Sequence, residues 1–303
     1  ICNNLAECYS ELTNAAADAR EKGKPILLEA NTFRIRGHEE ASGTKYYPEG
    51  MIDTAMSDEP MVKILHEPDR YATDEKSLQL AMEKAKARVD EAFHAALALD
   101  GPSYNAAEST SDLFAAVPAL PENATAGSRE MRLIDAIHDG LKESLALWPE
   151  LVYMGQDIGP YGGVFKATEG LADLFGSNRV RNTPLCESAI VGASLGWSIA
   201  GGKAMMEMQF SDFVTTGFNQ IVNNLAKLHW RWGQAVDVVV RMPTGAGVAA
   251  GPFHSQSTEA WFTHVPGLKV VYPAFPGEAK GLLMSSFNEP NPVLFFEHKA
   301  MYR

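Results

Sequence analysis

The chain has 303 residues, of which 46% are hydrophobic and 21% are charged, and its formal net charge is −12. This length and this balance are typical of a folded protein of about two domains with a substantial core. The acidic balance argues against nonspecific binding to nucleic acid or to an anionic membrane surface.

Cysteine usage and hydropathy bear on the compartment. The cysteines Cys2, Cys8 and Cys186 have neither the spacing of a metal site nor the density of a disulfide framework, which favours a reducing environment. We find no signal-peptide pattern at the start and no apolar run long enough to cross a bilayer. We expect an intracellular location. Because the chain begins at Ile1 within a helical pattern and stops at Arg303 directly after a strand pattern, we also expect a piece of a longer polypeptide.

The first hundred residues read as helices with one short strand. An apolar run at 25–30 predicts a buried strand. Apolar residues at helical spacing predict helices over 3–22, 57–67 and 74–99.

A basic group follows the run at 25–30. Arg34, Arg36 and His38 stand where open α/β sheets place ligands, and guanidinium and imidazole groups suit a phosphate. A solvated basic turn facing Glu39 and Glu40 explains the same residues, and the sequence leaves both readings open.

A change of composition divides the chain. Residues 101–127 combine three prolines with Ser, Ala, Asn and Glu and show no sustained period, which predicts a linker. The expected domains are therefore 1–100 and 128–303.

The second domain alternates strands with helices, which predicts a largely parallel sheet covered on both faces. The expected strands are 151–154, 236–242, 268–272 and 292–297, with a further buried strand before 213. The expected helices are 128–149, 218–232 and 277–287.

The stretch 183–213 is the strongest candidate for chemistry. Glu187 follows an X-Pro break and opens a run of small residues that predicts a closely packed helix. A carboxylate in the first turn of such a helix is held rigidly, although it could also do no more than complement the helix dipole.

His254 is the second candidate. It follows a glycine-rich loop and precedes Ser255, Gln256 and Ser257, so it could serve as a general acid or base, or be an ordinary surface histidine. No G-x-S-x-G elbow surrounds Ser255 or Ser257, and no phosphate loop, G-x-G-x-x-G or zinc-ligand spacing occurs in the sequence. Cys186 has no basic neighbour in the sequence to activate it, and we expect a buried structural thiol.

Short motifs follow one another through the second half of the chain. They are 156–159, 161–165, 183–187, 209–213, 254–257, 266–270 and 295–299. With them, the segment from about Met131 to Arg303 resembles the β subunit of the thiamine-diphosphate-dependent decarboxylating component of 2-oxo acid dehydrogenase complexes. Through the motif at 33–38, residues 1–100 resemble the carboxyl-terminal part of the α subunit of that enzyme. The resemblance is therefore to a fused α–β form of the thiamine-diphosphate-binding fold.

The resemblance implies roles for the candidate residues. Glu187 would hydrogen-bond the ring nitrogen of the cofactor's aminopyrimidine and favour its imino tautomer. Leu185 and Gln209 would line the pyrimidine, and Phe213 would lie against its ring. His254 would transfer protons as the acyl group passes to a lipoyl arm. From the α-like half, Arg34 and His38 would approach the diphosphate and the reacting end.

Metal sites are also implied by the resemblance. Magnesium would be held by an α-type motif that we expect upstream of this chain. A structural potassium ion would be held largely by backbone oxygens, at positions Val236, Val238, Val239, Ser286, Glu289 and Asn291.

The implied activity is oxidative decarboxylation of a 2-oxo acid with acyl transfer to the lipoyl domain of an acyltransferase core, in a homo-oligomer. The motifs at 183–187 and 209–213 favour branched-chain substrates, with pyruvate as the alternative. The alternative from a different class of function is a non-catalytic assembly module, which keeps the same sheet but has lost cofactor binding.

Overall fold

The computed structural model describes residues 4–39, 41–71, 73–119 and 129–303, and the chain divides into two compact units, Ile1–Pro102 and Ser103–Arg303. Within the described residues, no helix combines the length and the apolar character needed to cross a membrane.

The first unit is helical. Its longer helices start at side-chain caps, Asn4 for α1 and Asp74 for α4, whose oxygens accept the first free backbone N–H groups. The helices are α1 (Leu5–Lys22), α2 (Met51–Ser57), α3 (Pro60–His66) and α4 (Glu75–Leu97), with a 3-10 turn at Pro68–Tyr71. They agree with the predicted helices, except that the structure divides the predicted segment 57–67 between the end of α2 and α3.

The strand expected at 25–30 is wrong. These residues form no regular structure, and the side chain of Leu27 is 94% exposed. A strand needs a neighbour for its backbone N–H and C=O groups, and none of the described residues of this unit supplies one. The apolar stripe of α4 is likewise exposed at Met82, Val89 and Phe93.

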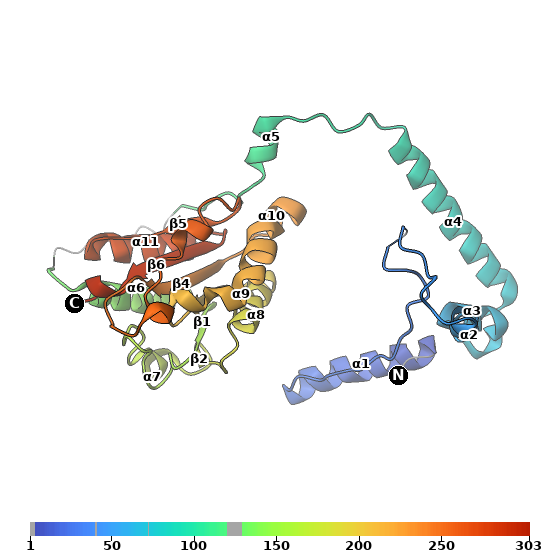
Figure 1. The fold of residues 1–303 in the computed structure, drawn as a ribbon. Coiled ribbons are helices and arrows are strands. Elements are labelled where there is room, and N and C mark those ends of the chain that lie inside the picture. The colour runs from blue at the N-terminus through green and yellow to red at the C-terminus, as the bar shows by residue number, and fades with distance from the viewer. Residues whose placement is uncertain (1–3, 40, 72, 120–128) are drawn as a thin grey trace. The chain divides into compact units, whose positions relative to one another are not determined.

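The second unit is built on one sheet of six parallel strands in the order β2-β1-β3-β4-β6-β5 (Figure 1). The strands are β1 (Leu151–Gly155), β2 (Val180–Asn182), β3 (Lys203–Glu207), β4 (Val238–Thr244), β5 (Lys269–Val271) and β6 (Val293–His298). The parallel sheet confirms the predicted fold class. The strand β2 was not predicted, since only one of its three residues is buried.

Helices cover both faces of the sheet, as expected. One face packs on α6 (Leu133–Leu147), α7 (Leu171–Phe175) and α11 (Pro276–Asn288). The other packs on α8 (Glu187–Ile199), α9 (Val214–Asn219) and α10 (Ala226–Trp232), with a π-helical turn at Gln220–Leu225. Strand residues alternate between the two cores, so that Val238 and Val240 face α8–α10 whereas Val239 faces α6 and α11.

Part of the predicted linker packs on the second unit. It carries a short helix, α5 (Ala106–Ser111). Beyond it, Asn291 donates to the carbonyl oxygen of Ala115 at 2.9 Å and accepts from its N–H at 2.7 Å, and Asn288 donates to Pro118 at 2.8 Å. Residues 120–128 of this segment lie outside the described residues.

Candidate active site

The candidate residues of the second unit share one edge of the sheet. In a parallel sheet the carboxyl ends of all strands meet at one edge, and ligands of open α/β sheets bind there. The stretch that carries Leu185 and Glu187 follows β2, the stretch from Gln209 to Phe213 follows β3, and the loop that ends in His254 follows β4.

Gln209 lies where the strand order reverses. The chain leaves β1 toward β2 and leaves β3 toward β4, so the neighbours β1 and β3 define the topological switch point. Across it, Gln209 Nε2 donates to Asp157 Oδ2 at 3.3 Å. Asp157 has a positive φ of 59°, a backbone conformation that is costly outside glycine and is concentrated at functional sites.

Glu187 is the first residue of α8, and its side chain is buried. Pro184 restricts the preceding backbone to an extended form, and the Thr183 N–H donates to the carbonyl oxygen of Gly155 at 2.9 Å, so helix α8 begins at the sheet edge. Glu187 is 8% exposed, and its carboxylate has no hydrogen-bond or ion-pair partner among the described residues. Glu187 stands in the first turn of α8, where the free backbone N–H groups of a helix N-terminus favour a negative charge.

The residues before Glu187 are open to the outside. Leu185 is 78% exposed, which leaves an apolar side chain free to contact a ring. Cys186 is also exposed, so the expectation of a buried thiol is wrong. The turn between Pro184 and α8 places its side chain outside the core.

His254 and Phe213 contact each other. Their ring centroids lie 5.5 Å apart at 83°, and the His254 ring also meets Phe210 edge-on at 4.8 Å and 86°. Phe210 continues the cluster to Phe165 at 5.4 Å. The structure therefore brings two predicted residues from separate loops into one aromatic cluster.

The chain around His254 is anchored by a residue that the sequence analysis did not single out. Asp212 Oδ1 accepts from the backbone N–H of Ser255 at 3.1 Å and of Gln256 at 3.0 Å. Asp212 lies inside the motif at 209–213, so its position in the sequence was the one available signal.

A buried charge cluster lies below this edge. Arg241 of β4 donates through Nε and Nη2 to Glu297 of β6, both at 2.6 Å, and through Nη1 to Glu207 of β3. Tyr302 donates to Glu297 at 2.6 Å. The sequence signal was a charged residue near the end of each of three apolar strands, since buried charges require partners.

Protonation in this cluster follows burial and charge. Burial raises the pKa of Glu207, which Arg241 partly offsets and Glu297 reinforces. Although burial opposes it, Glu297 and Glu207 raise the pKa of Arg241 further. Burial, with Glu297 beside it, also raises the pKa of Tyr302 well above its usual range.

Arg34 and His38 belong to the first unit, where both are exposed. Arg34 Nη2 donates to Tyr46 at 3.2 Å, and this bond and one to Tyr47 raise its pKa. Their proposed approach to the diphosphate stays a prediction.

The residues expected at a potassium ion are already bonded within the protein. Lys269 Nζ lies 2.6 Å from Glu289, and Asn291 donates to the same carboxylate. The Val236 carbonyl oxygen accepts from the Val238 N–H at 2.9 Å, and Ser286 Oγ donates to Leu282 at 2.7 Å. Because the expected ligands are largely backbone oxygens, and an oxygen in one hydrogen bond keeps a second lone pair, these contacts do not test the potassium site, which stays a prediction.

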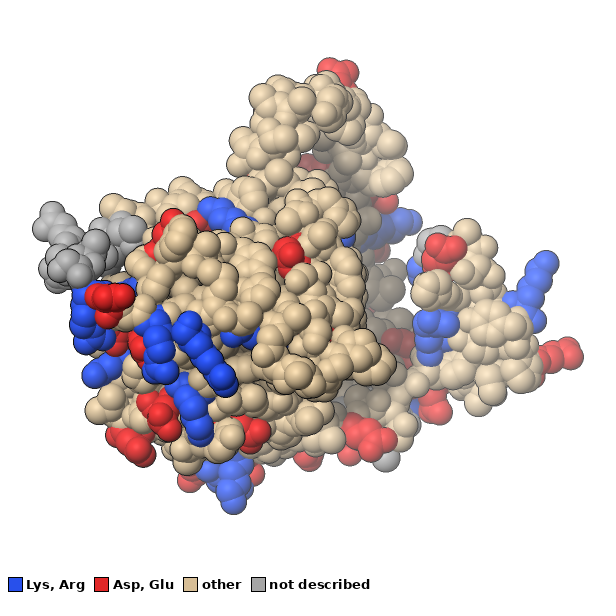
Figure 2. All heavy atoms as spheres, turned by 60° about the vertical axis from the view of Figure 1, so that its left-hand side comes forward, with Lys and Arg blue, Asp and Glu red and all other residues tan. Residues whose placement is uncertain are grey.

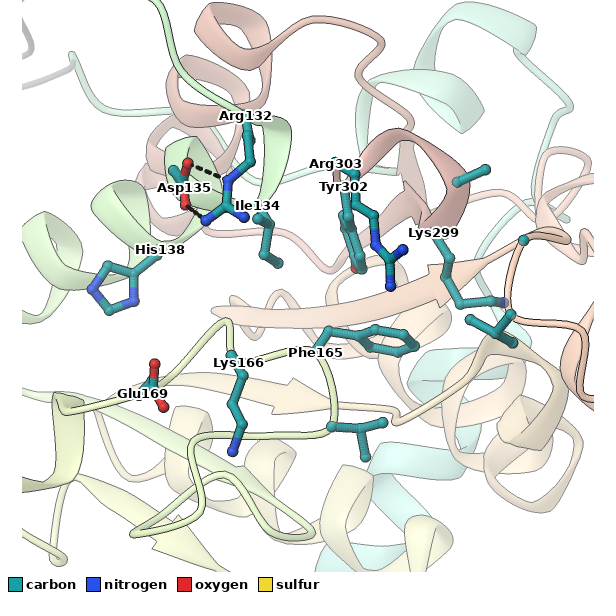
Figure 3. Close-up of a pocket in the computed structure, with 14 residues that line it drawn as sticks. Arg132, Ile134, Asp135, His138, Phe165, Lys166, Glu169, Lys299, Tyr302 and Arg303 are labelled. Carbon is teal, nitrogen blue, oxygen red and sulfur yellow. Dashed lines mark hydrogen bonds and ion pairs between the residues drawn. The ribbon is translucent and has the colours of Figure 1, made fainter.

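A cavity of about 730 Å³ opens next to the aromatic cluster (Figure 3). Phe165 and Lys299 belong to its lining, which includes none of Glu187, Gln209, Phe213 and His254. Figure 3 shows Arg132 bonded to Asp135 at the top of the cavity and Phe165 opposite Tyr302 and Arg303. On the face in Figure 2, basic and acidic side chains are mixed rather than gathered by sign.

The residues of the sheet edge fit the pyrimidine half of thiamine diphosphate. A buried carboxylate without a partner can accept from a protonated ring nitrogen, an amide at the switch point can bond a polar ring substituent, and Leu185 and Phe213 offer apolar contact to a flat ring. The fold and this edge together define the class, an open α/β domain whose ligand-binding edge lies at the carboxyl ends of its parallel strands.

The comparison with family models gives the particular family. Residues 129–303 match "Transketolase, pyrimidine binding domain", which is more than half of the chain, and the chain therefore belongs to this thiamine-diphosphate-dependent family. Residues 3–102 match "Dehydrogenase E1 component". The two matches confirm the resemblance drawn from the motifs.

Curated relatives match the second part of the chain. It is 47% identical over 185 residues to the 2-oxoisovalerate dehydrogenase subunit beta 2 of Arabidopsis thaliana, covering 60% of this chain and 51% of the relative. It is 46% identical over 175 residues to the 2-oxoisovalerate dehydrogenase subunit beta of Bacillus subtilis, covering 57% and 54%. A pyruvate dehydrogenase E1 component subunit beta from Leifsonia xyli is 39% identical over 176 residues, covering 57% and 52%. The chain spans about half the length of these relatives.

Proposed function

We propose that the protein catalyses oxidative decarboxylation of a branched-chain 2-oxo acid, with transfer of the acyl group to a lipoyl arm. The observation that carries this proposal is Glu187, a buried carboxylate without a partner among the described residues, at the head of a helix on the ligand-binding edge of the sheet.

Each residue of the edge has a part in the proposed reaction. When bound, thiamine diphosphate supplies a thiazolium carbon that adds to the 2-oxo group. Glu187 exchanges a proton with the pyrimidine ring nitrogen, and Gln209 orients the ring's polar side from its place on Asp157. Leu185 and Phe213 exclude water from the ring faces. His254 moves a proton as the acyl group leaves for the lipoyl sulfur.

The substrate proposal rests on the relatives. Those with 2-oxoisovalerate in their names reach 47% identity, and the pyruvate dehydrogenase subunits reach 40%. Pyruvate is therefore the second candidate.

The partners, the metal ions and the location are proposed from the relatives as well. We propose a homo-oligomer that binds the lipoyl domain of an acyltransferase core, and magnesium held outside this chain. Potassium is kept as a proposal for backbone oxygens only, because Lys269 already neutralises Glu289. Relatives from Arabidopsis and Dictyostelium are named as mitochondrial, which supports the mitochondrial matrix, and the Bacillus relative supports the bacterial cytoplasm.

The test is 2-oxo acid-dependent dye reduction by the protein expressed from its complete gene, with thiamine diphosphate and magnesium. We expect kcat/KM for 3-methyl-2-oxobutanoate to exceed that for pyruvate about tenfold, the scale on which apolar pockets separate aliphatic chains of different size. Equal or better use of pyruvate would overturn the substrate proposal. Absence of thiamine diphosphate binding by calorimetry would favour the non-catalytic assembly module.

A further inference from the structure

His254 lacks the usual means of orientation. A histidine that transfers protons is commonly held by a hydrogen bond to its second ring nitrogen. Here Nδ1 is buried and has no hydrogen-bond partner among the described residues. Its orientation must therefore come from the rings of Phe210 and Phe213 and from its own backbone.

The backbone after His254 is clamped at both sides of Gln256. Its N–H, like that of Ser255, donates to Asp212 Oδ1. Its carbonyl oxygen accepts from the Gly245 N–H at 2.9 Å and from Thr244 Oγ1 at 3.1 Å. These bonds join the two ends of the loop 245–256, two residues after His254.

The clamp depends on a buried charge. Asp212 is buried, and its second oxygen, Oδ2, has no hydrogen-bond partner among the described residues. Lys299 is 5% exposed, and its Nζ is likewise buried without a hydrogen-bond partner in the described part of the chain. Burial lowers the pKa of Lys299, and the negative charge of Asp212 partly offsets that shift.

Lys299 lies over the ring of Phe210, which stands two residues before Asp212 in the chain. Lys299 Nζ lies 5.1 Å from the centroid of that ring, which is a cation–π distance, and the same ring contacts His254 at 4.8 Å. Asp212 therefore acts on His254 through the backbone, and Lys299 acts through Phe210.

We propose that Asp212, balanced by Lys299, is the positioning residue that holds His254 in place for proton transfer during acyl transfer to the lipoyl arm. The assignment of that step to His254 rests on the proposed function. Asp212 and Lys299 touch neither substrate nor cofactor in this proposal.

The first experiment needs no substrate. In the protein expressed from its complete gene, hydrogen exchange of residues 245–257 is compared between wild type and Asp212→Ala, with Asp212→Asn keeping an acceptor oxygen without the charge. We expect exchange in this loop to rise about tenfold or more in Asp212→Ala and less in Asp212→Asn. The matched control is Asp237→Asn, since Asp237 pairs with Lys203 at 2.6 Å at the other end of the strands.

The second experiment separates positioning from general loss of structure. Asp212→Ala is expected to lower acylation of a free lipoyl domain about tenfold or more while dye-coupled decarboxylation changes about threefold or less. Adding Asp212→Ala to His254→Ala should lower acylation no further, because Asp212 acts only through His254.

Unchanged exchange of the loop, equal loss of both activities, or additive losses in the double variant would overturn the inference. A wild-type protein that decarboxylates no 2-oxo acid would instead overturn the proposed function. Hydrogen exchange would still decide whether Asp212 holds the loop.

Discussion

Arg241→Met removes a fully buried guanidinium from between two buried carboxylates. Glu207 and Glu297 then face each other across β4 without the cation that compensates them. Breaking a buried pair by removing one partner costs about 3–5 kcal/mol, because the remaining charge stays desolvated. Against a total stability of about 5–15 kcal/mol, this is a loss of about a fifth or more.

The assay is urea unfolding followed by tryptophan fluorescence, at several pH values. Without Arg241 the pKa of Glu207 rises further, so the folded variant binds more protons than its unfolded chain. The deficit of Arg241→Met should therefore shrink as the pH falls from about 8 to about 5.

Glu207→Gln is the matched control. It leaves the two bonds between Arg241 and Glu297, and we expect a change below about 1 kcal/mol at neutral pH. Because burial raises the pKa of Glu207, its contribution is full below its ordinary pKa and is lost as the pH rises through the raised value. A deficit of Arg241→Met under about 1 kcal/mol, or one that does not change with pH, would refute the reasoning.

Three further predictions concern the stability of the second unit, measured as the free energy of unfolding in urea. Gly267→Ala should lower the free energy of unfolding by about 2 kcal/mol or more, since φ is 90° and the added Cβ would overlap the Ala226 carbonyl oxygen. Its control, Gly277→Ala in α11, has nothing within 4 Å of the added Cβ and should raise the free energy of unfolding by about 0.5–1 kcal/mol. The reverse order of stability would contradict the backbone geometry. Asn291→Ala should cost about 2–3 kcal/mol and expose residues 103–119 to proteolysis, because both bonds to Ala115 are lost; an unchanged cleavage pattern would argue against that contact. Burial lowers the pKa of Lys299, so between that lowered pKa and about 10.5 the unfolded chain binds more protons than the folded one. The free energy of unfolding should therefore rise with pH through this window in the wild type but not in Lys299→Met. An equal dependence on pH in both proteins would count against the burial of a charged Lys299.

Local patterns predicted the second unit well. Apolar runs such as 236–242 and 292–297 became β4 and β6, because a strand buried on both faces is continuous in its hydrophobicity. The same rule failed at 25–30, where the run is present but no partner strand among the described residues of the first unit completes it. An apolar run therefore shows that a segment can form a buried strand, but a strand forms only where a neighbouring strand pairs with it.

The candidate site divides in the same way. Glu187 and His254 were found from their places beside a helix start and a glycine-rich loop. The clamp of Asp212 on Ser255 and Gln256 joins residues more than forty positions apart, and no local pattern reports such a contact. The Arg241 cluster was within reach, since a charge inside an apolar run has to find a partner.

We propose that the carboxylate of Glu187 activates thiamine diphosphate. The most direct measurement is decarboxylation of 3-methyl-2-oxobutanoate by Glu187→Gln, in the protein expressed from its complete gene, with the circular dichroism spectrum as control for the fold. We predict that kcat falls about 100-fold or more with the spectrum unchanged, because glutamine cannot exchange the proton. Near-wild-type kcat in Glu187→Gln would contradict the account and leave Glu187 as a residue that only complements the dipole of α8.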